Sequence, residues 1–126
     1  KVISVELVAS ASDDAKVNVN LNAIKNVEIV NAKVEDYLVQ AQESNLRADT
    51  LIIDPPRDGM HPKALETIAQ FGASEMIYVS CNPATLVRDL EYLVKNTAYK
   101  VSDITPVDMF AHTHHIECVV RLELQK

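Results

Sequence analysis

The sequence has 126 residues, a length typical of a single domain that buries its own core. Apolar residues make up 48% of it and charged residues 24%, without the run of about 18 apolar residues that a membrane-spanning helix requires. With 12 basic and 18 acidic side chains the formal net charge is -6, which excludes an overall basic surface for nucleic acid.

The first part of the chain alternates predicted strands and predicted helices. Residues 1–7, KVISVEL, alternate apolar and polar side chains as a strand does, and residues 10–14 are rich in the Ser and Asp that start helices. Apolar residues then recur at helical spacing as far as Asn26. VEIVNA at 27–32 predicts a second strand, and VEDYLVQAQ at 34–42 predicts a short helix.

The middle of the chain continues this alternation. The apolar run at 51–53 closes on Asp54, where two prolines and a glycine prevent the strand from continuing. A proline opens each of the predicted helices at 62–71 and 83–96. SEMIYVSC at 74–81 is the predicted strand between them.

The tail differs because no helix separates its two predicted strands. YKVSDITPVDMF at 99–110 is extended and broken by Pro106, and HHIECVVRLELQ at 114–125 is a long strand, so we expect an antiparallel pair. The whole pattern predicts a doubly wound, Rossmann-like α/β sheet that is mainly parallel, with an antiparallel C-terminal strand. We expect one domain over residues 1–126.

Three residues with chemical potential, Glu6, Asp54 and Cys81, fall where predicted strands end. In doubly wound sheets ligands bind beyond the C-terminal ends of the strands. Cys81 also precedes a predicted helix, whose N-terminal N–H groups and dipole favour the thiolate form of a nucleophile. The alternative is a cysteine buried as a small apolar residue, and the residues alone leave both interpretations open.

The DPPR sequence at 54–57 combines a carboxylate, two rigid prolines and a guanidinium. The prolines would fix a backbone across which a flat ligand can lie, and Arg57 could hold a phosphate through two hydrogen bonds. A simple turn is the alternative. Glu6 could accept hydrogen bonds from ribose hydroxyls, and a solvated strand end is an equal alternative there.

The segment HTHHIECVV raises the question of a metal site, since it holds three histidines, Glu117 and Cys118. It lacks an HExxH motif, and a strand points successive side chains to opposite faces, so we expect no metal. Cys118 falls on the apolar face of the strand and is predicted to be core. Glu117 falls on the other face, where a carboxylate could act as a general base.

The two cysteines, Cys81 and Cys118, are expected to stay reduced. The first ten residues, KVISVELVAS, lack the apolar run and the cleavage site of a secretory signal. We therefore expect a cytoplasmic protein without membrane attachment.

Three segments in this order, DPPRDGMHPKAL, VSCNPATLVRDL and HTHHIECVV, closely resemble the RNA uracil-5-methyltransferases that use S-adenosylmethionine. Residues 2–38 resemble the second and third cofactor-binding segments of the same family. The resemblance implies an enzyme that methylates C5 of a uridine in tRNA or rRNA.

The resemblance also implies a role for each candidate residue. Cys81 matches the nucleophile that adds to C6 of a uracil flipped out of its stack, and Glu117 matches the base that removes the C5 proton. Glu6 matches the acidic residue on the cofactor ribose, and Asp54 matches the first residue of the motif beside cofactor and target. The other positions expected to contact the RNA substrate are Pro55, Arg57 and Asn82.

The chain also departs from the family pattern. The glycine-rich first cofactor motif, with the central strand of the sheet, would precede Lys1, as would the RNA-binding region. We therefore expect a partial catalytic domain that is inactive alone, with a gap between the strands that end at Glu6 and Asp54. The missing N-terminal domains of the same enzyme would complete it, and the alternatives are a degenerate family member and a chain completed by another chain. Ala32-Lys33 stands where the family usually has Gly-Asp, so a cation replaces the acidic partner expected near adenine.

Two other functions are weighed against this one. The first is a non-catalytic module that binds RNA or a protein partner through a degenerate methyltransferase fold, and it is motivated by Lys33 and by the absent glycine-rich motif. The second, more remote, is a hydrolase that uses Cys81 with His112 or His114.

Overall fold

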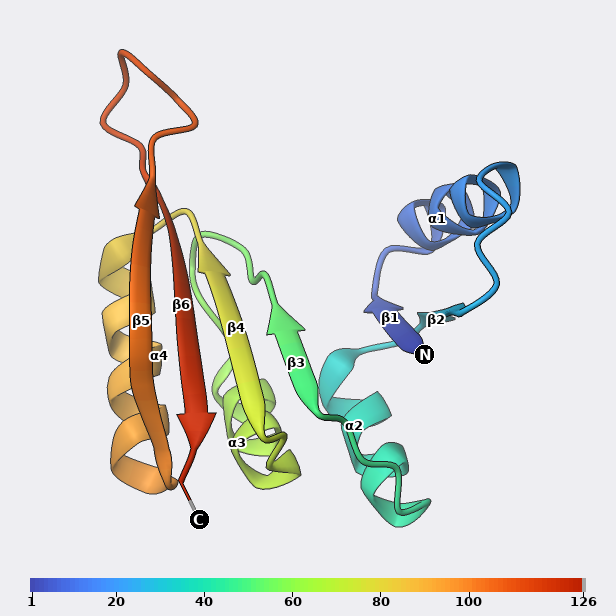
Figure 1. Ribbon diagram of the computed structural model, residues 1–126, viewed down its shortest axis with the longest axis horizontal. Helices are drawn as coiled ribbons and strands as arrows, with labels where there is room; N and C mark the ends of the chain where they lie inside the picture. Colours follow the sequence, from blue (N-terminus) through green and yellow to red (C-terminus); the bar gives the residue numbers. More distant parts are fainter. Residues whose placement is uncertain (126) are drawn as a thin grey trace. The chain divides into compact units, whose positions relative to one another are not determined.

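The computed structural model describes residues 1–125 and contains alternating strands and helices along that range (Figure 1). The elements in chain order are β1 Val2–Glu6, α1 Ala9–Leu21, β2 Val27–Asn31, α2 Val34–Glu43, β3 Thr50–Ile53, α3 Pro62–Phe71, β4 Glu75–Ser80, α4 Pro83–Asn96, β5 Tyr99–Val107 and β6 Glu117–Leu124. This order matches the predicted succession of strands and helices.

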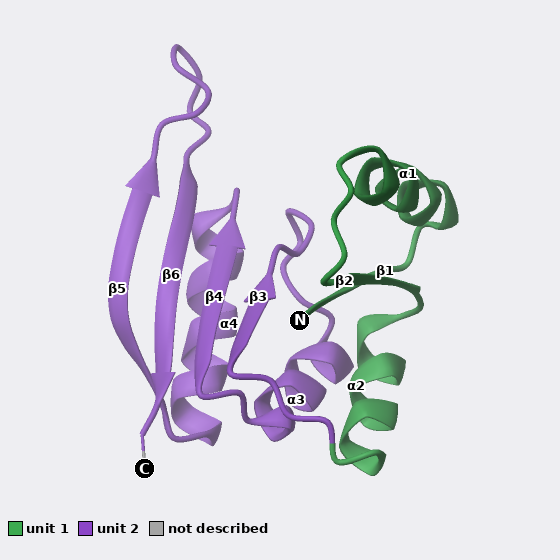
Figure 2. Cartoon of the chain, turned by 45° about the vertical axis from the view of Figure 1, so that its right-hand side comes forward, with its two compact units in different colours: residues 1–45 green, residues 46–126 purple. Residues whose placement is uncertain are grey.

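The chain divides into two compact units, Lys1–Asn45 and a second unit that begins at Leu46 (Figure 2). The first unit holds β1, α1, β2 and α2, and the second holds the remaining elements. The assignment of one partial methyltransferase domain to residues 1–126 stays a prediction.

In the first unit β1 and β2 form a parallel pair, in which Val2 pairs with Val27 and Glu6 with Asn31. The Asn31 side-chain amide donates to the Glu6 carbonyl at 2.8 Å, which ties the ends of the two strands together. The Glu6 carboxylate accepts a hydrogen bond of 2.7 Å from the Val8 N–H. These contacts fix the Glu6 side chain at the C-terminal end of β1.

The first helix is shorter than the apolar pattern predicted, because it ends at Leu21 and not at Asn26. The Asn22 side-chain amide donates to the Asn18 carbonyl at 2.8 Å, and Ala23 has a positive φ of 52°. Asparagine side chains compete for backbone partners, and a left-handed residue cannot continue a right-handed helix. Both effects end α1 before the last apolar residues of the pattern.

The second unit contains a four-stranded sheet in the order β3-β4-β6-β5. β3 and β4 are parallel, and β6 runs antiparallel to both β4 and β5. The predicted α/β fold with parallel strands and an antiparallel C-terminal strand is thereby confirmed, as is the antiparallel pairing of the last two strands. Within residues 1–125, β1 and β3 belong to different sheets, and a missing strand between them stays a prediction.

Pro106 does not break β5, contrary to the sequence prediction. The strand continues through Pro106, which pairs with Cys118, and ends at Val107. β5 lies at the edge of the sheet, where one side of the strand needs no ladder hydrogen bonds. A residue without an N–H is tolerated at such an edge.

The last strand begins at Glu117 and not at His114. Immediately before it, the Thr113 hydroxyl donates to the Phe110 carbonyl at 2.7 Å and accepts from the His115 N–H at 3.2 Å. These local hydrogen bonds compete with strand pairing and form a turn. Glu117 is therefore the first residue held in the ladder.

The core of the second unit lies between one face of the sheet and the helices α3 and α4, which both lie behind the strands in Figure 1. The buried sheet residues on this face are Ile53, Met76, Tyr78, Ser80, Tyr99, Cys118, Val120 and Leu122. Cys118 is a core residue, as predicted. From α4 the core receives Leu86 and Leu93 and, unexpectedly, the carboxylate of Asp89.

Candidate active site

A pocket of about 350 Å³ opens at the end of the sheet in the second unit. This volume lies within the range of about 300 to 1,000 Å³ that is usual for small-molecule sites. The pocket is lined by Asp54, Val79, Cys81, Val107, Met109, Glu117 and Val119. Three polar groups predicted for chemistry therefore share one pocket with mostly apolar walls.

Strand pairing explains why these residues meet. β3 and β4 are parallel neighbours, so Asp54, just after β3, and Cys81, just after β4, leave the sheet at the same edge. β6 is antiparallel to β4, and Ser80 pairs with Cys118. Cys81 follows Ser80 and Glu117 precedes Cys118, so the thiol and the carboxylate face each other at that edge.

Cys81 is a free thiol and is partly exposed, whereas Cys118 is buried. The Ser80 hydroxyl beside it accepts from the Asn82 N–H and donates to the Asn82 carbonyl, both at 3.1 Å. The Asn82 side-chain oxygen accepts from the Ala84 N–H at 3.1 Å and caps α4. This turn holds Cys81 shortly before the N-terminus of α4 and at the wall of the pocket, and its role as a nucleophile stays a prediction.

Residues 54–61, called the DPPR loop below, are attached to the start of α4. The Arg57 carbonyl accepts from the Asn82 side-chain amide and from the Thr85 hydroxyl, each at 3.0 Å. The Arg57 side chain is exposed and Pro55 is half-buried. Both polar groups of the Asn82 side chain are thus engaged within the protein, and a contact of Asn82 with RNA stays a prediction.

Asp89 is a buried charged group that the sequence reasoning missed. Its side chain is fully buried and accepts hydrogen bonds from the Tyr78 hydroxyl at 2.6 Å and from the Met60 N–H at 2.8 Å. Burial, followed by this hydrogen bond to Asp89, raises the pKa of Tyr78, so the phenol stays protonated and donates. The signal in the sequence is an aspartate on the same helix face as Leu86 and Leu93.

Substitution of Gly59 is expected to lower the unfolding free energy measurably. It has a positive φ of 77°, and an added Cβ would lie 2.5 Å from Arg88 Nη2 and 2.8 Å from Asp89 Oδ2. Gly72 also has a positive φ, 69°, but its nearest contact would be an ordinary 3.8 Å. Gly72→Ala is expected to cost about 1 kcal/mol of unfolding free energy from backbone strain. Gly59→Ala is expected to cost about 1 to 3 kcal/mol more, because it also disturbs the Asp89 hydrogen bonds.

Urea unfolding of the two variants, followed by circular dichroism, measures this difference. Gly72→Ala is the matched control, since it carries the same backbone strain without the collision. Equal losses of stability in the two variants would contradict the close approach of Gly59 to the Arg88–Asp89 pair.

In the first unit Glu6 has a partly exposed carboxylate at the end of β1, and its contact with a cofactor ribose stays a prediction. Lys33 is exposed and stands at the N-cap of α2, where it makes no side-chain cap.

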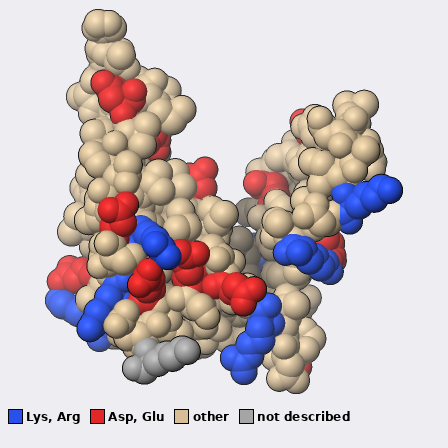
Figure 3. Space-filling model, viewed as in Figure 1, with Lys and Arg blue, Asp and Glu red and all other residues tan. Residues whose placement is uncertain are grey.

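Charged side chains of both signs are mixed on the face of the second unit drawn in Figure 3. Arg121 forms ion pairs with Glu75 and with Glu123 on this sheet. Hydrogen bonds from Thr50 and from Arg121 hold the pKa of Glu75 below its ordinary value. Arg121 is therefore paired with two carboxylates of the sheet.

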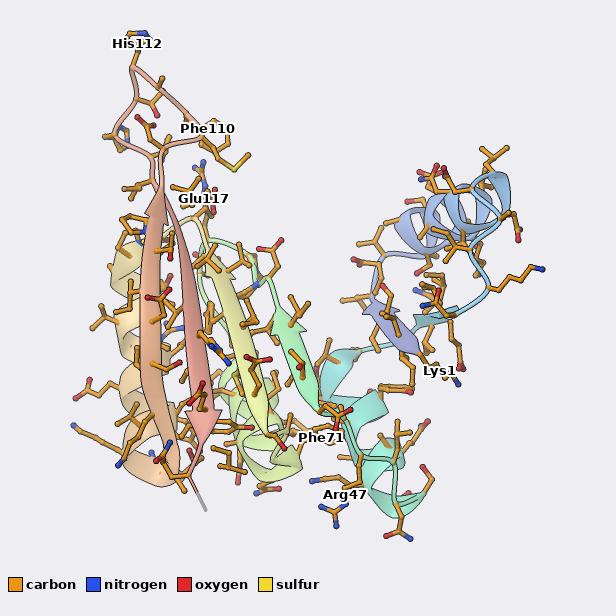
Figure 4. All side chains as sticks on the ribbon, in the orientation of Figure 1. Lys1, Arg47, Phe71, Phe110, His112 and Glu117 are labelled. Carbon is orange, nitrogen blue, oxygen red and sulfur yellow. The ribbon has the colours of Figure 1, made fainter. Side chains whose placement is uncertain are left out.

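The histidines of the tail lie on the loop between β5 and β6, and Figure 4 shows His112 and Phe110 there, with Glu117 at the root of the loop. The rings of His114 and His115 are 4.2 Å apart. Among residues 1–125 no group of three or more His, Cys, Asp or Glu side chains is arranged to hold a metal ion. In the same range no helix is long and apolar enough to cross a membrane.

Comparison with known proteins agrees with this geometry. A sequence model described as tRNA (uracil-5-)-methyltransferase matches residues 1–125. The chain belongs to the tRNA (uracil-5-)-methyltransferase family. The relationship confirms the resemblance read from the DPPR, SCNPATL and HTHHIE segments.

Relatives of this tRNA (uracil-5-)-methyltransferase family member include an uncharacterized RNA methyltransferase of Bacteroides thetaiotaomicron, 46% identical over 99% of the chain. A second uncharacterized RNA methyltransferase, from Bacillus cereus, is 44% identical over 95% of the chain. The chain covers only 27% of the first relative and 26% of the second. It therefore spans about a quarter of the length of the curated relatives it matches.

A solved structure is also similar to this family member. It is the tRNA (uracil-54, C5)-methyltransferase of Pyrococcus abyssi in complex with S-adenosyl-L-homocysteine, with a TM-score of 0.80 and 32% sequence identity. The similarity covers 95% of this chain and 28% of the Pyrococcus chain.

Proposed function

We propose that this chain is the C-terminal catalytic part of an RNA methyltransferase that transfers a methyl group from S-adenosylmethionine to C5 of a uridine in tRNA or rRNA. The observation that carries the proposal is the meeting of Cys81, Glu117 and Asp54 in one pocket of a member of this family. The similar Pyrococcus structure, of an enzyme for uracil C5 bound to the demethylated cofactor, supports it.

The first step assigned to the pocket is covalent activation of the base by Cys81. C5 of uracil is a weak nucleophile in the intact ring. The thiolate forms a bond to C6, and the C5–C6 electron pair moves to give an enolate at the C4 carbonyl, which makes C5 nucleophilic. S-adenosylmethionine, when bound, would supply an electrophilic methyl group to C5, and its S–CH3 bond would break to leave S-adenosylhomocysteine.

The second step assigned to the pocket is proton removal by Glu117. After methylation C5 still carries its hydrogen, and the carboxylate removes it as a proton. The electron pair left at C5 restores the C5–C6 double bond, the bond between Sγ of Cys81 and C6 breaks, and the thiolate is released. The opposed positions of the two residues across β4 and β6 suit one group attacking C6 and the other acting at C5.

The apolar walls of the pocket suit a base that has left its stack. Val79, Val107 and Val119 line the pocket beside the two catalytic groups. Aliphatic side chains can pack against the faces of a flipped pyrimidine, and Asp54 offers a hydrogen-bond acceptor at the same place. We place Pro55, Arg57 and Asn82 at the contact with the surrounding RNA, with Arg57 on a phosphate.

The binding of the methyl donor is assigned to Glu6 and Asp54. Glu6 accepts hydrogen bonds from the ribose hydroxyls, and Asp54 lies beside the donor and the target. Lys33 stands where an acidic residue near adenine is expected from the family pattern. The contact of Lys33 with the adenine ring is therefore expected to differ from that of an acidic residue.

The remaining functions are assigned to further domains of the same enzyme. The curated relatives are about four times as long as this chain, and the formal net charge of -6 gives it little overall attraction for RNA. The larger part of the RNA-binding surface and the rest of the cofactor site are therefore placed outside residues 1–126, and this chain alone is expected to be inactive. The enzyme is expected to act in the cytoplasm, where tRNA and rRNA are modified.

The proposal is tested with the full-length protein that carries this segment. Total tRNA and rRNA lacking 5-methyluridine are incubated with the protein and S-adenosylmethionine carrying an isotopically labelled methyl group. Mass spectrometry of the nucleosides is expected to find the label in 5-methyluridine, in one of the two RNA classes. Label in another nucleoside, or in none, would contradict the proposal.

A second candidate is a non-catalytic module that binds RNA or a protein partner, and the exposed Lys33 favours it. Titration calorimetry of the full-length protein with S-adenosylhomocysteine separates the two functions. Binding of the cofactor product in the micromolar range, about -8 kcal/mol, would argue against the non-catalytic module.

A further inference from the structure

Two residues outside the pocket, Arg88 and Asp89 of α4, hold the DPPR loop through hydrogen bonds. Asp89 Oδ2 accepts from the Met60 N–H at 2.8 Å, and Asp89 Oδ1 accepts from Arg88 Nε at 2.9 Å and Arg88 Nη2 at 2.8 Å. Arg88 Nη2 also donates to the Asp58 carbonyl at 3.0 Å. The pair thus binds the backbone of the loop through both a donor and an acceptor.

The side chains of Arg88 and Asp89 hold the DPPR loop and do not serve to stabilise α4 itself. A buried carboxylate is costly unless donors surround it, and Asp89 receives them from β4, from its neighbour Arg88 and from the DPPR loop. Gly59 lies against the pair so closely that a Cβ would collide with it. Arg88 itself is 55% exposed, so its side chain contributes little to the core.

The hydrogen bonds of Arg88 and Asp89 are connected to the catalytic pocket through the DPPR loop. Residues 58–60 are held by Arg88 and Asp89, and the Arg57 carbonyl is held by Asn82 and Thr85 at the start of the same helix. The helix begins two residues after Cys81. One element therefore fixes both the thiol and the backbone of the loop that carries Asp54.

We propose that Arg88 and Asp89 are positioning residues for the reaction, which hold the DPPR loop so that Asp54 and Arg57 keep their places relative to Cys81. This inference rests on the proposed function and deepens it. Loops move more freely than the elements they connect, whereas catalytic groups must be held to a fraction of an ångström. The pair supplies this restraint without touching the substrate.

The test uses Arg88→Lys in the full-length protein. Lysine keeps the positive charge but lacks the planar fork that reaches Asp89 and the Asp58 carbonyl together. Arg121→Lys is the matched control, because Arg121 is 51% exposed and also paired with carboxylates, on β6 and away from the DPPR loop. Asp89→Asn is a second variant, which keeps the shape of the side chain and removes its charge.

Two measurements are made on each variant. Amide hydrogen exchange of residues 58–61, followed by mass spectrometry, is expected to become roughly tenfold faster in Arg88→Lys and in Asp89→Asn than in wild type or Arg121→Lys. The rate of covalent complex formation with RNA that contains 5-fluorouridine is expected to fall roughly tenfold or more in the same two variants. The melting temperature of Arg88→Lys is expected to stay close to that of Arg121→Lys.

The outcomes separate the positioning role from the proposed function. Unchanged exchange at residues 58–61 in Arg88→Lys and Asp89→Asn would overturn the inference, as would faster exchange with a wild-type rate of complex formation. Faster exchange together with slower complex formation supports it. A wild-type protein that methylates no uridine overturns the proposed function, and the exchange data then decide whether the pair holds the loop.

Discussion

Replacement of Cys81 by alanine is expected to abolish both uridine methylation and the covalent complex with 5-fluorouridine RNA, a loss of roughly a thousandfold or more in rate. The physical reason is the composition of the pocket. Its other polar groups are the carboxylates of Asp54 and Glu117, which are poor nucleophiles towards C6 of a pyrimidine. The full-length protein, cofactor and RNA are incubated together, and the complex is measured as a band of higher mass on a denaturing gel.

Cys118→Ala is the matched control for this result. Cys118 is also a free cysteine, but it is buried on the face of β6 opposite to that of Glu117. Its replacement is expected to lower the unfolding free energy by about 1 kcal/mol and to leave the covalent complex intact. A covalent complex that persists in Cys81→Ala would exclude the thiol as the nucleophile.

Replacement of Glu117 by glutamine is expected to lower turnover by about 10²- to 10⁴-fold and to accumulate a methylated protein–RNA adduct on ordinary RNA. Glutamine keeps the size of the side chain but cannot take the proton from C5. Addition by Cys81 and methylation still occur, and elimination stops because it requires that proton to leave. Mass spectrometry of the nuclease-treated adduct measures the attached nucleotide with its methyl group.

Glu123→Gln is the control for the second result. Glu123 lies on the same strand, on the same face as Glu117, and is paired with Arg121 far along β6 from the pocket. This variant is expected to turn over normally and to accumulate no adduct. Normal turnover in Glu117→Gln would remove Glu117 from the role of base, and another group would have to take the proton.

The two helices that begin with proline were predicted to the residue, because their limits are set locally. Pro62 and Pro83 start α3 and α4, each after a residue whose side chain caps the helix. Gly72, with a left-handed backbone, ends α3. The end of α1 was not predicted, because the turn at Asn22 depends on side-chain hydrogen bonds that an apolar pattern does not reveal.

The residues that line the pocket were predicted more completely than the strand pairing that brings them together. The residue types and the strand ends pointed to Asp54, Cys81 and Glu117, and all three line the pocket. Their meeting depends on β6 lying between β4 and β5, a pairing that no local pattern encodes. Asp89 was missed for the same reason, since its partners Met60 and Tyr78 are distant in the sequence.

The antiparallel ladder between β4 and β6 has a consequence for how this site can vary. The ladder, and not the length of the intervening chain, sets the alignment of Cys81 with Glu117. Residues added at 108–116, in the loop between β5 and β6, would leave that alignment unchanged, whereas one residue inserted within β6 would turn Glu117 to the opposite face. Related enzymes can thus carry the two motifs at different separations, provided that strand register is preserved.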